Sequence, residues 1–197
     1  MKRSHIALIL VLAVVTAFIF GDFVFISSRS DINASTGVGR ACGNVTINEG
    51  FCIYPNSDFG RIMADELQAR GEEVVILESP TKCEGQFLAV WVEEMNVMYS
   101  PFFSRGSIKA RFIYSNVGDP AHYLRYENAT DKEKEFIKFI VNKSEVGASG
   151  EIILIDRSKG VMSLKGYKRY LLKRAAIAIV SELQKIDLDN TKCPNSS

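Results

Sequence analysis

The apolar positions of this chain are concentrated at its N-terminus. All residues of segment 6–20 but one are apolar, and after a Gly-Asp pair the run resumes at 23–26. A helix needs roughly 20 mainly apolar residues to cross about 30 Å of hydrocarbon, and segment 6–26 supplies them. The pattern therefore predicts a transmembrane signal anchor over residues 6–26. The basic residues that precede it predict a cytoplasmic tail of residues 1–5, because positive charge is retained on that side.

A cleaved signal peptide is the alternative interpretation of the same segment. Its basic start and its short apolar run are both present, but it also needs a small-residue cleavage motif. The candidates for that motif, which end at Gly21 and at Ser30, are poor matches. We therefore favour an uncleaved anchor at the cell membrane, with the rest of the chain on the extracytoplasmic side.

Beyond the apolar segment, the chain divides into a polar stretch and a single domain's length of sequence. Residues 27–41 contain Ser, Gly, Asn and Asp and few apolar residues, which predicts a flexible stalk. Residues 42–193 are the expected extracytoplasmic domain, and a chain of this size buries roughly 70% of its unfolded surface. Residues 194–197 are expected to be a short tail.

Within the domain, several runs of strand-type residues follow one another, and segments with helical periodicity lie on either side of them. The apolar phase of segment 86–99 shifts at Glu93–Glu94, which predicts a β-bulge. Grouped strands with helices at both ends predict an α+β fold with two layers, in which helices pack on one face of a mixed or antiparallel sheet. Strands are expected at 51–54, 74–77, 86–99, 108–114, 122–126 and 152–155, and helices at about 58–70, 130–140 and 164–186.

Two resemblances follow from this order of elements. Segment 54–75, beginning Tyr-Pro-Asn-Ser-Asp-Phe-Gly, looks like one βαβ unit of the periplasmic amino-acid-binding proteins. The whole domain is similar to small envelope auxiliary proteins of the transport-auxiliary and TolB N-terminal type. That resemblance implies a non-enzymatic assembly or adaptor part of the envelope. The chain differs from that group because it lacks a lipid-modified cysteine after its apolar segment and carries cysteines and glycosylation sequons instead.

All four cysteines lie downstream of the anchor, where the compartment is oxidising. Their spacing is too wide for a zinc site, so two disulfides are expected. Four cysteines allow three connectivities. We favour a local loop and a clasp for the C-terminal tail, that is, Cys42–Cys52 and Cys83–Cys193.

Five N-x-S/T sequons are also present downstream of the anchor, more than chance predicts for ten asparagines. Glycosylation requires exposed acceptor sites. The acceptors of greatest interest are Asn33, Asn44, Asn128 and Asn142, with Asn195 in the tail. Asn33 in the stalk and Asn128 beside a helix start are the sites that we expect to be modified.

Composition and motifs argue against nucleic-acid binding and against most enzymatic functions. The formal net charge is +1, whereas binding nucleic acid needs a clear basic excess. His122 is the only histidine outside the N-terminal segment, and no nucleophile motif accompanies it. No cofactor or metal site is predicted. We favour a non-catalytic binding or assembly component of the envelope, whose partner is another envelope protein or a surface polymer. The alternative is a hydrolase or transferase with a site near His122 and Glu93 or Glu94.

One segment stands out as a possible contact surface. Met98, Phe102 and Phe103 lie at the expected hairpin tip beside Arg105. An apolar tip of this kind is typical of a docking patch for a partner or for the membrane surface. The alternative is that these side chains fold back into the core, since large apolar patches are rare on soluble surfaces.

Overall fold

The computed structural model describes residues 3–40, 47–138 and 145–189. It is a mixed α+β fold built on one six-stranded sheet with the strand order β1-β6-β5-β4-β2-β3. The first four of these strands run antiparallel to one another, whereas β2 lies parallel to both β3 and β4. The strands are β1 (Val24–Arg40), β2 (Phe51–Tyr54), β3 (Val74–Ile76), β4 (Gln86–Tyr99), β5 (Phe103–Ser115) and β6 (Val146–Met162).

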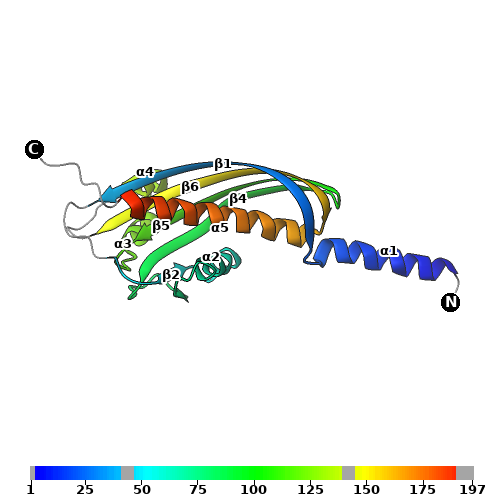
Figure 1. Cartoon of the computed structure of the whole chain (residues 1–197), viewed down its shortest axis with the longest axis horizontal. Helices are drawn as coiled ribbons and strands as arrows, with labels where there is room; N and C mark the ends of the chain where they lie inside the picture. Colours follow the sequence, from blue (N-terminus) through cyan, green and yellow to red (C-terminus); the bar gives the residue numbers. More distant parts are fainter. Residues whose placement is uncertain (1–2, 41–46, 139–144, 190–197) are drawn as a thin grey trace, which may run out of the picture.

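Five helices occur in the described ranges, and two of them form the layer that covers the inner face of the sheet. They are α1 (Arg3–Phe20), α2 (Asp58–Gln68), α3 (Ala121–Asn128), α4 (Lys132–Ile137) and α5 (Leu164–Asp189). The four long strands arch over α5, and α2 lies beside it (Figure 1). The main core forms where even-numbered residues of β5 and β6 meet the apolar side of α5. Its largest fully buried side chains include Phe112, Ile108, Leu154, Met162, Tyr167 and Leu171.

The other two short helices, α3 and α4, pack on the opposite, outer face at one end of the sheet. There Trp91, Tyr126 and Phe136 form an aromatic cluster over Phe87 and Ile113. The expectation that helices cover only one face is therefore wrong. The reason is visible in β4, where an unbroken apolar run of residues 87–92 leaves apolar side chains on both faces, and both must be covered.

The segment expected to be a stalk is in fact the edge strand β1. Residues 24–40 pair with β6 in continuous antiparallel register from Val24↔Met162 to Arg40↔Val146. The strand is polar because most of its side chains are exposed at the sheet edge, so its composition is like that of a linker. A polar edge strand and a polar linker have the same composition, so composition alone predicted a stalk here. The folded domain begins at residue 24 rather than at 42.

The apolar N-terminal segment is not one uninterrupted helix over residues 6–26. Helix α1 ends at Phe20, and residues 24–26 already belong to β1. Gly21 donates its backbone N–H to the carbonyl oxygen of Ala17 and closes the last turn of the helix. Within the described ranges, no helix is both long enough and apolar enough to cross a membrane.

Several local predictions can be checked directly. The β-bulge is confirmed, because the register of β4 against β5 shifts between Val92 and Glu94. The start of α2 is confirmed as well: the Ser57 side chain accepts the N–H of Gly60, and Gly71 adopts a φ of +90° just beyond the helix. Residues 122–126, expected to form a strand, instead lie in α3, because Pro120 begins a helix whose Tyr126 reaches the aromatic cluster.

Candidate functional site

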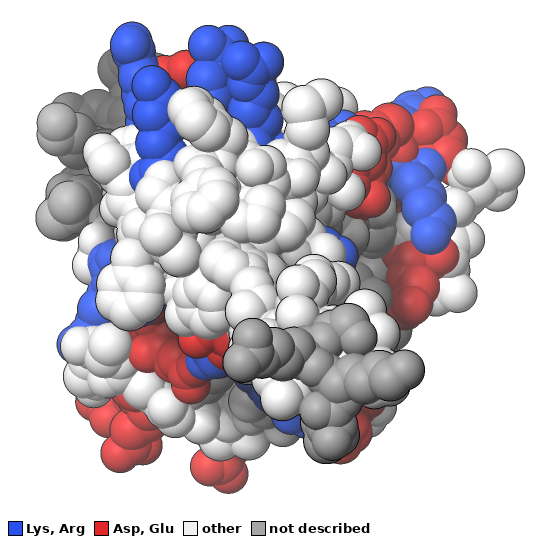
Figure 2. Space-filling view, turned by 90° about the vertical axis from the view of Figure 1, so that its right-hand side faces the viewer, with Lys and Arg blue, Asp and Glu red and all other residues white. Residues whose placement is uncertain are grey.

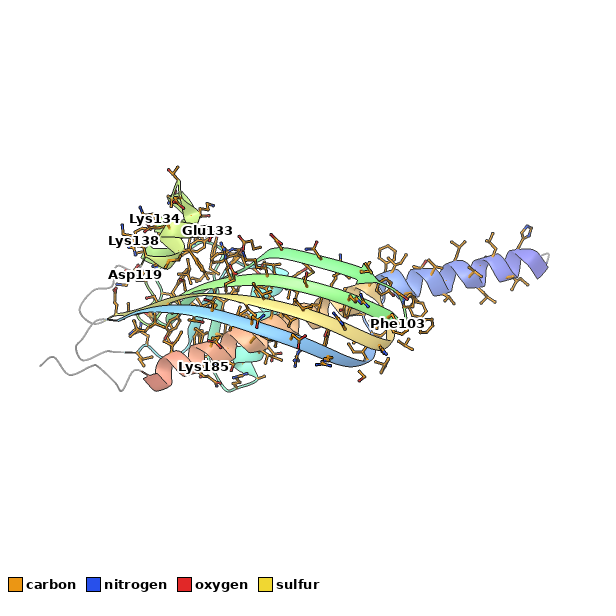
Figure 3. The ribbon with its side chains drawn as sticks, turned by 90° about the horizontal axis from the view of Figure 1, so that it is seen from above. Phe103, Asp119, Glu133, Lys134, Lys138 and Lys185 are labelled. Atoms are coloured by element: carbon orange, nitrogen blue, oxygen red, sulfur yellow. A yellow bond between two sulfur atoms is a disulfide. The ribbon has the colours of Figure 1, made fainter. Side chains whose placement is uncertain are left out.

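The tip of the β4–β5 hairpin lies at the end of the sheet that adjoins α1, which we call the proximal end. Tyr99 Oη donates to the carbonyl oxygens of Phe18 (3.1 Å) and Met162 (2.8 Å). The Phe102 ring lies 6.4 Å from that of Phe18, centroid to centroid. Figure 3 shows Phe103 at this end, opposite the labelled residues of α4.

The apolar side chains of the tip do not fold back into the core. Met98, Phe102 and Phe103 are 73%, 58% and 61% exposed. Phe25, next to them in the molecule's proximal end, is 75% exposed. The structure therefore leaves an exposed apolar rim, which we define as Phe25, Met98, Phe102, Phe103 and Val161.

Behind this rim, three arginines form a row across neighbouring strands. Arg29 of β1 is opposite Arg157 of β6, and Arg157 is opposite Arg105 of β5. All three side chains are exposed on the outer face of the sheet. None of them has an ion pair or hydrogen bond to another described residue. We call these three residues the arginine row.

Two basic residues nearer the other end of the outer face, Lys109 and Arg111, are paired with carboxylates. Lys109 Nζ lies 3.0 Å from Glu93 and 3.1 Å from Glu151. Arg111, whose side chain is almost fully buried, contacts the carboxylates of Glu93 (3.0 Å), Glu151 (2.8 Å) and Glu133 (2.8 Å). Burial alone would raise the pKa of Glu151, but hydrogen bonds from Arg111 and Lys109 outweigh burial and hold that pKa below its usual range.

An open groove of about 440 Å³ lies on the outer face at the arginine row. Arg105 and Arg157 supply its cationic groups, Asn96 and Ser107 add polar side chains, and Met98 and Ile155 add apolar surface. Guanidinium groups bind phosphate and carboxylate oxygens in a bidentate manner, so the groove is suited to an anionic group.

On the inner face, directly behind this groove, a buried carboxylate binds three hydroxyl groups. Asp156 is fully buried and accepts from Ser30 Oγ (2.6 Å), Ser158 Oγ (2.6 Å) and Tyr167 Oη (2.8 Å). Burial, followed by the hydrogen bond to Asp156, raises the pKa of Tyr167 well above its ordinary value. Gly106 allows α5 to pack closely against β5, because an added Cβ there would lie 2.5 Å from Leu171 Cδ1. The cluster joins β1, β6 and α5.

The connection between α1 and the sheet is held by polar contacts. Ser163 Oγ donates to the carbonyl oxygen of Phe23 at 3.2 Å, and Arg169 lies 3.0 Å from Asp22. The Phe18 and Phe23 rings meet edge to face at 5.5 Å. The end of α1 is therefore bound to the start of α5 and to the hairpin tip.

His122 occupies a buried position in α3. Burial, with a smaller contribution from the charge of Arg125, lowers the pKa of His122 to about 4. Glu93, proposed above as its acidic partner, is instead bound to Lys109 and Arg111. Glu94 is exposed on β4. The groups that influence His122 are Arg125, Glu135 and the backbone of Phe136, so the structure does not assemble the catalytic arrangement that the sequence suggested.

The disulfide in the structure joins Cys52 of β2 to Cys83. The favoured pairing is therefore wrong for both residues, because β2 and the segment before β4 lie side by side in the parallel part of the sheet. The other two cysteines, Cys42 and Cys193, lie outside the described residues.

Two of the predicted glycosylation acceptors can be placed. Asn33 lies on the edge strand β1 and is exposed, and Asn128 ends α3, where its side-chain amide donates to the carbonyl oxygen of Leu124 at 2.8 Å. Both are accessible to solvent, which glycosylation requires. Asn44, Asn142 and Asn195 lie outside the described residues.

Sequence reasoning missed two members of the arginine row. Arg29 fell in the expected stalk, and Arg157 lay beyond the expected strand 152–155. The apolar alternation stops at Ile155 in the sequence, and only the structure shows that residues 155, 157, 159 and 161 are all exposed. Asp156 sits between two of them in the buried phase, which marks it as a core acid.

Among the residues that the structure describes, no group of three or more His, Cys, Asp or Glu side chains is placed to hold a metal ion. The proximal end thus offers cationic and apolar groups for binding.

Comparison with models of known protein families finds none that matches this chain, and no curated protein matches it either.

Proposed function

We propose that this protein is a membrane-anchored, extracytoplasmic binding or assembly component of the cell envelope, attached to the membrane through α1. The observation that carries the proposal is the exposed apolar surface of α1. Apart from the half-buried Phe18, its large apolar side chains from Ile6 to Phe20 are 41–71% exposed. Such a surface needs an apolar partner, and the hydrocarbon layer of a membrane is one.

The binding role is supported by the chemistry of the exposed surfaces. The arginine row and apolar rim offer recognition groups, while the histidine is buried and the acidic residues near it are already paired. A catalytic group has to reach its substrate. The resemblance to non-enzymatic envelope auxiliary proteins favours the same role.

Two measurements on native cells test the anchor. The full chain should stay in the membrane after alkaline carbonate extraction, and protease added to intact cells should remove the domain but leave a short N-terminal fragment. A mature N-terminus at Asp22 would contradict the anchor. A start at Asp31 would also cut β1 and remove Ser30 from the Asp156 cluster.

The non-catalytic role is tested by replacing His122. We expect His122→Asn to leave the cellular phenotype unchanged in a folded, normally located protein, because this side chain has a structural place in α3. Loss of the phenotype with unchanged folding and membrane attachment would show that the protein has a catalytic function.

A further inference from the structure

We propose that the proximal end of the outer face docks onto the anionic phosphate headgroups of the membrane that α1 enters, with the apolar rim inserted and the arginine row bound to phosphates. The proposal rests on the proposed anchor and adds a second, separate contact with the same membrane. The ligand class is the phosphate headgroup of an anionic lipid at a bilayer surface.

The first argument is the order of side chains along the strands. Phe25 is opposite Val161 at the proximal edge, Lys159 is two residues further along β6, and Arg157 is two residues further again. With a rise of about 3.3 Å per residue, Lys159 lies about 7 Å and Arg157 about 13 Å from the Phe25–Val161 pair. An apolar edge followed by cations matches the order of hydrocarbon and headgroups at a membrane surface.

The second argument is that no described carboxylate forms an ion pair with the arginine row. Like charges directly opposite each other on one face of a sheet destabilise it. Here Arg157 has an arginine opposite it on each side, and the described chain supplies no carboxylate to any of the three. On the same face, Lys109 and Arg111 are fully paired. Anions from outside the domain would relieve this repulsion, and a membrane surface presents many of them at once.

The third argument is the continuity of the apolar rim with α1. Phe102 contacts Phe18 near the end of α1, so the rim and the helix form one exposed apolar surface. Figure 2 looks onto this end of the molecule and shows Lys and Arg gathered along one side of a broad uncharged surface. The cation of Lys159 lies 5.5 Å from the centre of the Phe103 ring, which keeps a basic group at the border of the rim. Aromatic and basic side chains of this kind favour the interface between hydrocarbon and headgroups.

The reporter is a tryptophan placed in the rim of the full chain. Phe103→Trp combined with Trp91→Phe leaves a single tryptophan, since Trp91 is the only one in the sequence. The protein is reconstituted in nanodiscs of phosphatidylcholine alone or mixed with phosphatidylglycerol, and its fluorescence is quenched with lipids brominated near the headgroup. A second reporter, Phe25→Trp with Trp91→Phe, guards against a folding defect at residue 103.

We expect strong quenching in discs that contain phosphatidylglycerol and weak quenching in phosphatidylcholine. The triple variant Arg29→Gln, Arg105→Gln, Arg157→Gln should lower the docking equilibrium constant by about a hundredfold, from about 1 kcal/mol for each basic residue at an anionic surface. Its quenching should then fall to the level seen in phosphatidylcholine.

The matched control removes three basic residues at the opposite end. Lys134, Lys138 and Lys185 lie far from Phe103 in Figure 3, and all three are exposed. The triple lysine-to-glutamine variant has the same net charge as the arginine variant, so it should retain quenching if position rather than net charge decides docking.

The readouts separate the two proposals. Failure of the chain to co-elute with nanodiscs would contradict the anchor. Co-elution with equal, weak quenching in both lipids would overturn the docking proposal and leave the anchor standing. Quenching that persists in the arginine variant would also overturn it. Loss of quenching on addition of inorganic phosphate, but not of chloride at equal ionic strength, would assign the row to a free anion instead of a lipid.

Discussion

The two ends of the outer face belong to the same strands but differ in whether their arginines are buried in ion pairs or exposed without them. At the end covered by α3 and α4, Arg111 is buried beneath Phe136 and bound to three carboxylates. At the proximal end, the arginine row is exposed and forms no ion pair with a described residue. The paired charges hold helices on the sheet. The unpaired charges hold nothing inside the domain, so the partner that we propose for them lies outside it.

The largest expected effect comes from removing the paired arginine. Arg111→Met should lower the free energy of unfolding by about 2–4 kcal/mol, because it leaves a group of carboxylates beside the sheet without their central cation. Urea denaturation of the full chain in neutral detergent measures the change.

The matched substitution at the proximal end is Arg105→Met, which should change stability by no more than about 0.5 kcal/mol. Equal losses from the two substitutions would abolish the contrast between the ends of the face.

A pH titration tests the same covered end through His122. Its pKa is about 4 in the folded protein, below the ordinary 6.5, so the unfolded chain binds more protons between these values. Stability from this group is complete above about pH 6.5 and is lost as the pH falls toward 4, by about 3 kcal/mol at most. Denaturation midpoints measured from pH 7 to pH 4 should show the loss.

Other carboxylates titrate in this range, so the comparison is with His122→Asn. This variant should remove the part of the slope between pH 6.5 and 4 that His122 causes. An unchanged slope would show that the histidine is exposed or already charged in the folded protein.

The smallest effect has the opposite sign. Arg157→Gln removes the central charge of the arginine row and should raise stability in neutral detergent by about 0.2–0.5 kcal/mol at low salt, because the repulsion from Arg29 and Arg105 disappears. The gain should vanish at high salt, where exposed charges are screened. A loss of stability at low salt would mean that Arg157 has a stabilising partner within the chain.

The sequence predicted well where local chemistry decides the structure. The cap at Ser57, the left-handed glycine at 71 and the bulge in β4 depend on neighbouring residues, and each is present. The α+β class with a mixed sheet also followed from the pattern of strands and helices. These features depend on the type and spacing of residues within a short segment, so the sequence of that segment is enough to predict them.

Features that depend on distant partners were missed. Strand β1 is polar because it lies at the edge, and only its pairing with β6 distinguishes it from a linker. The sequence supplied only part of the proposed contact surface, namely Met98, Phe102, Phe103 and Arg105. Arg29 and Arg157 join Arg105 only once the register of three strands is known. The Cys52–Cys83 pair has the same cause, since it depends on which strands are neighbours.

The direct passage from α1 into β1 has a mechanical consequence. β1 leaves the helix at the proximal end and runs the length of the sheet, paired with β6 at every position of its span. In the proposed anchored arrangement, a force that pulls the far end of the domain away from α1 therefore acts along the axis of β1. All of its hydrogen bonds to β6 share that load in shear, whereas a strand pulled sideways would lose them one at a time. The same segment that was expected to be a flexible stalk is thus arranged to carry tension between α1 and the far end of the domain.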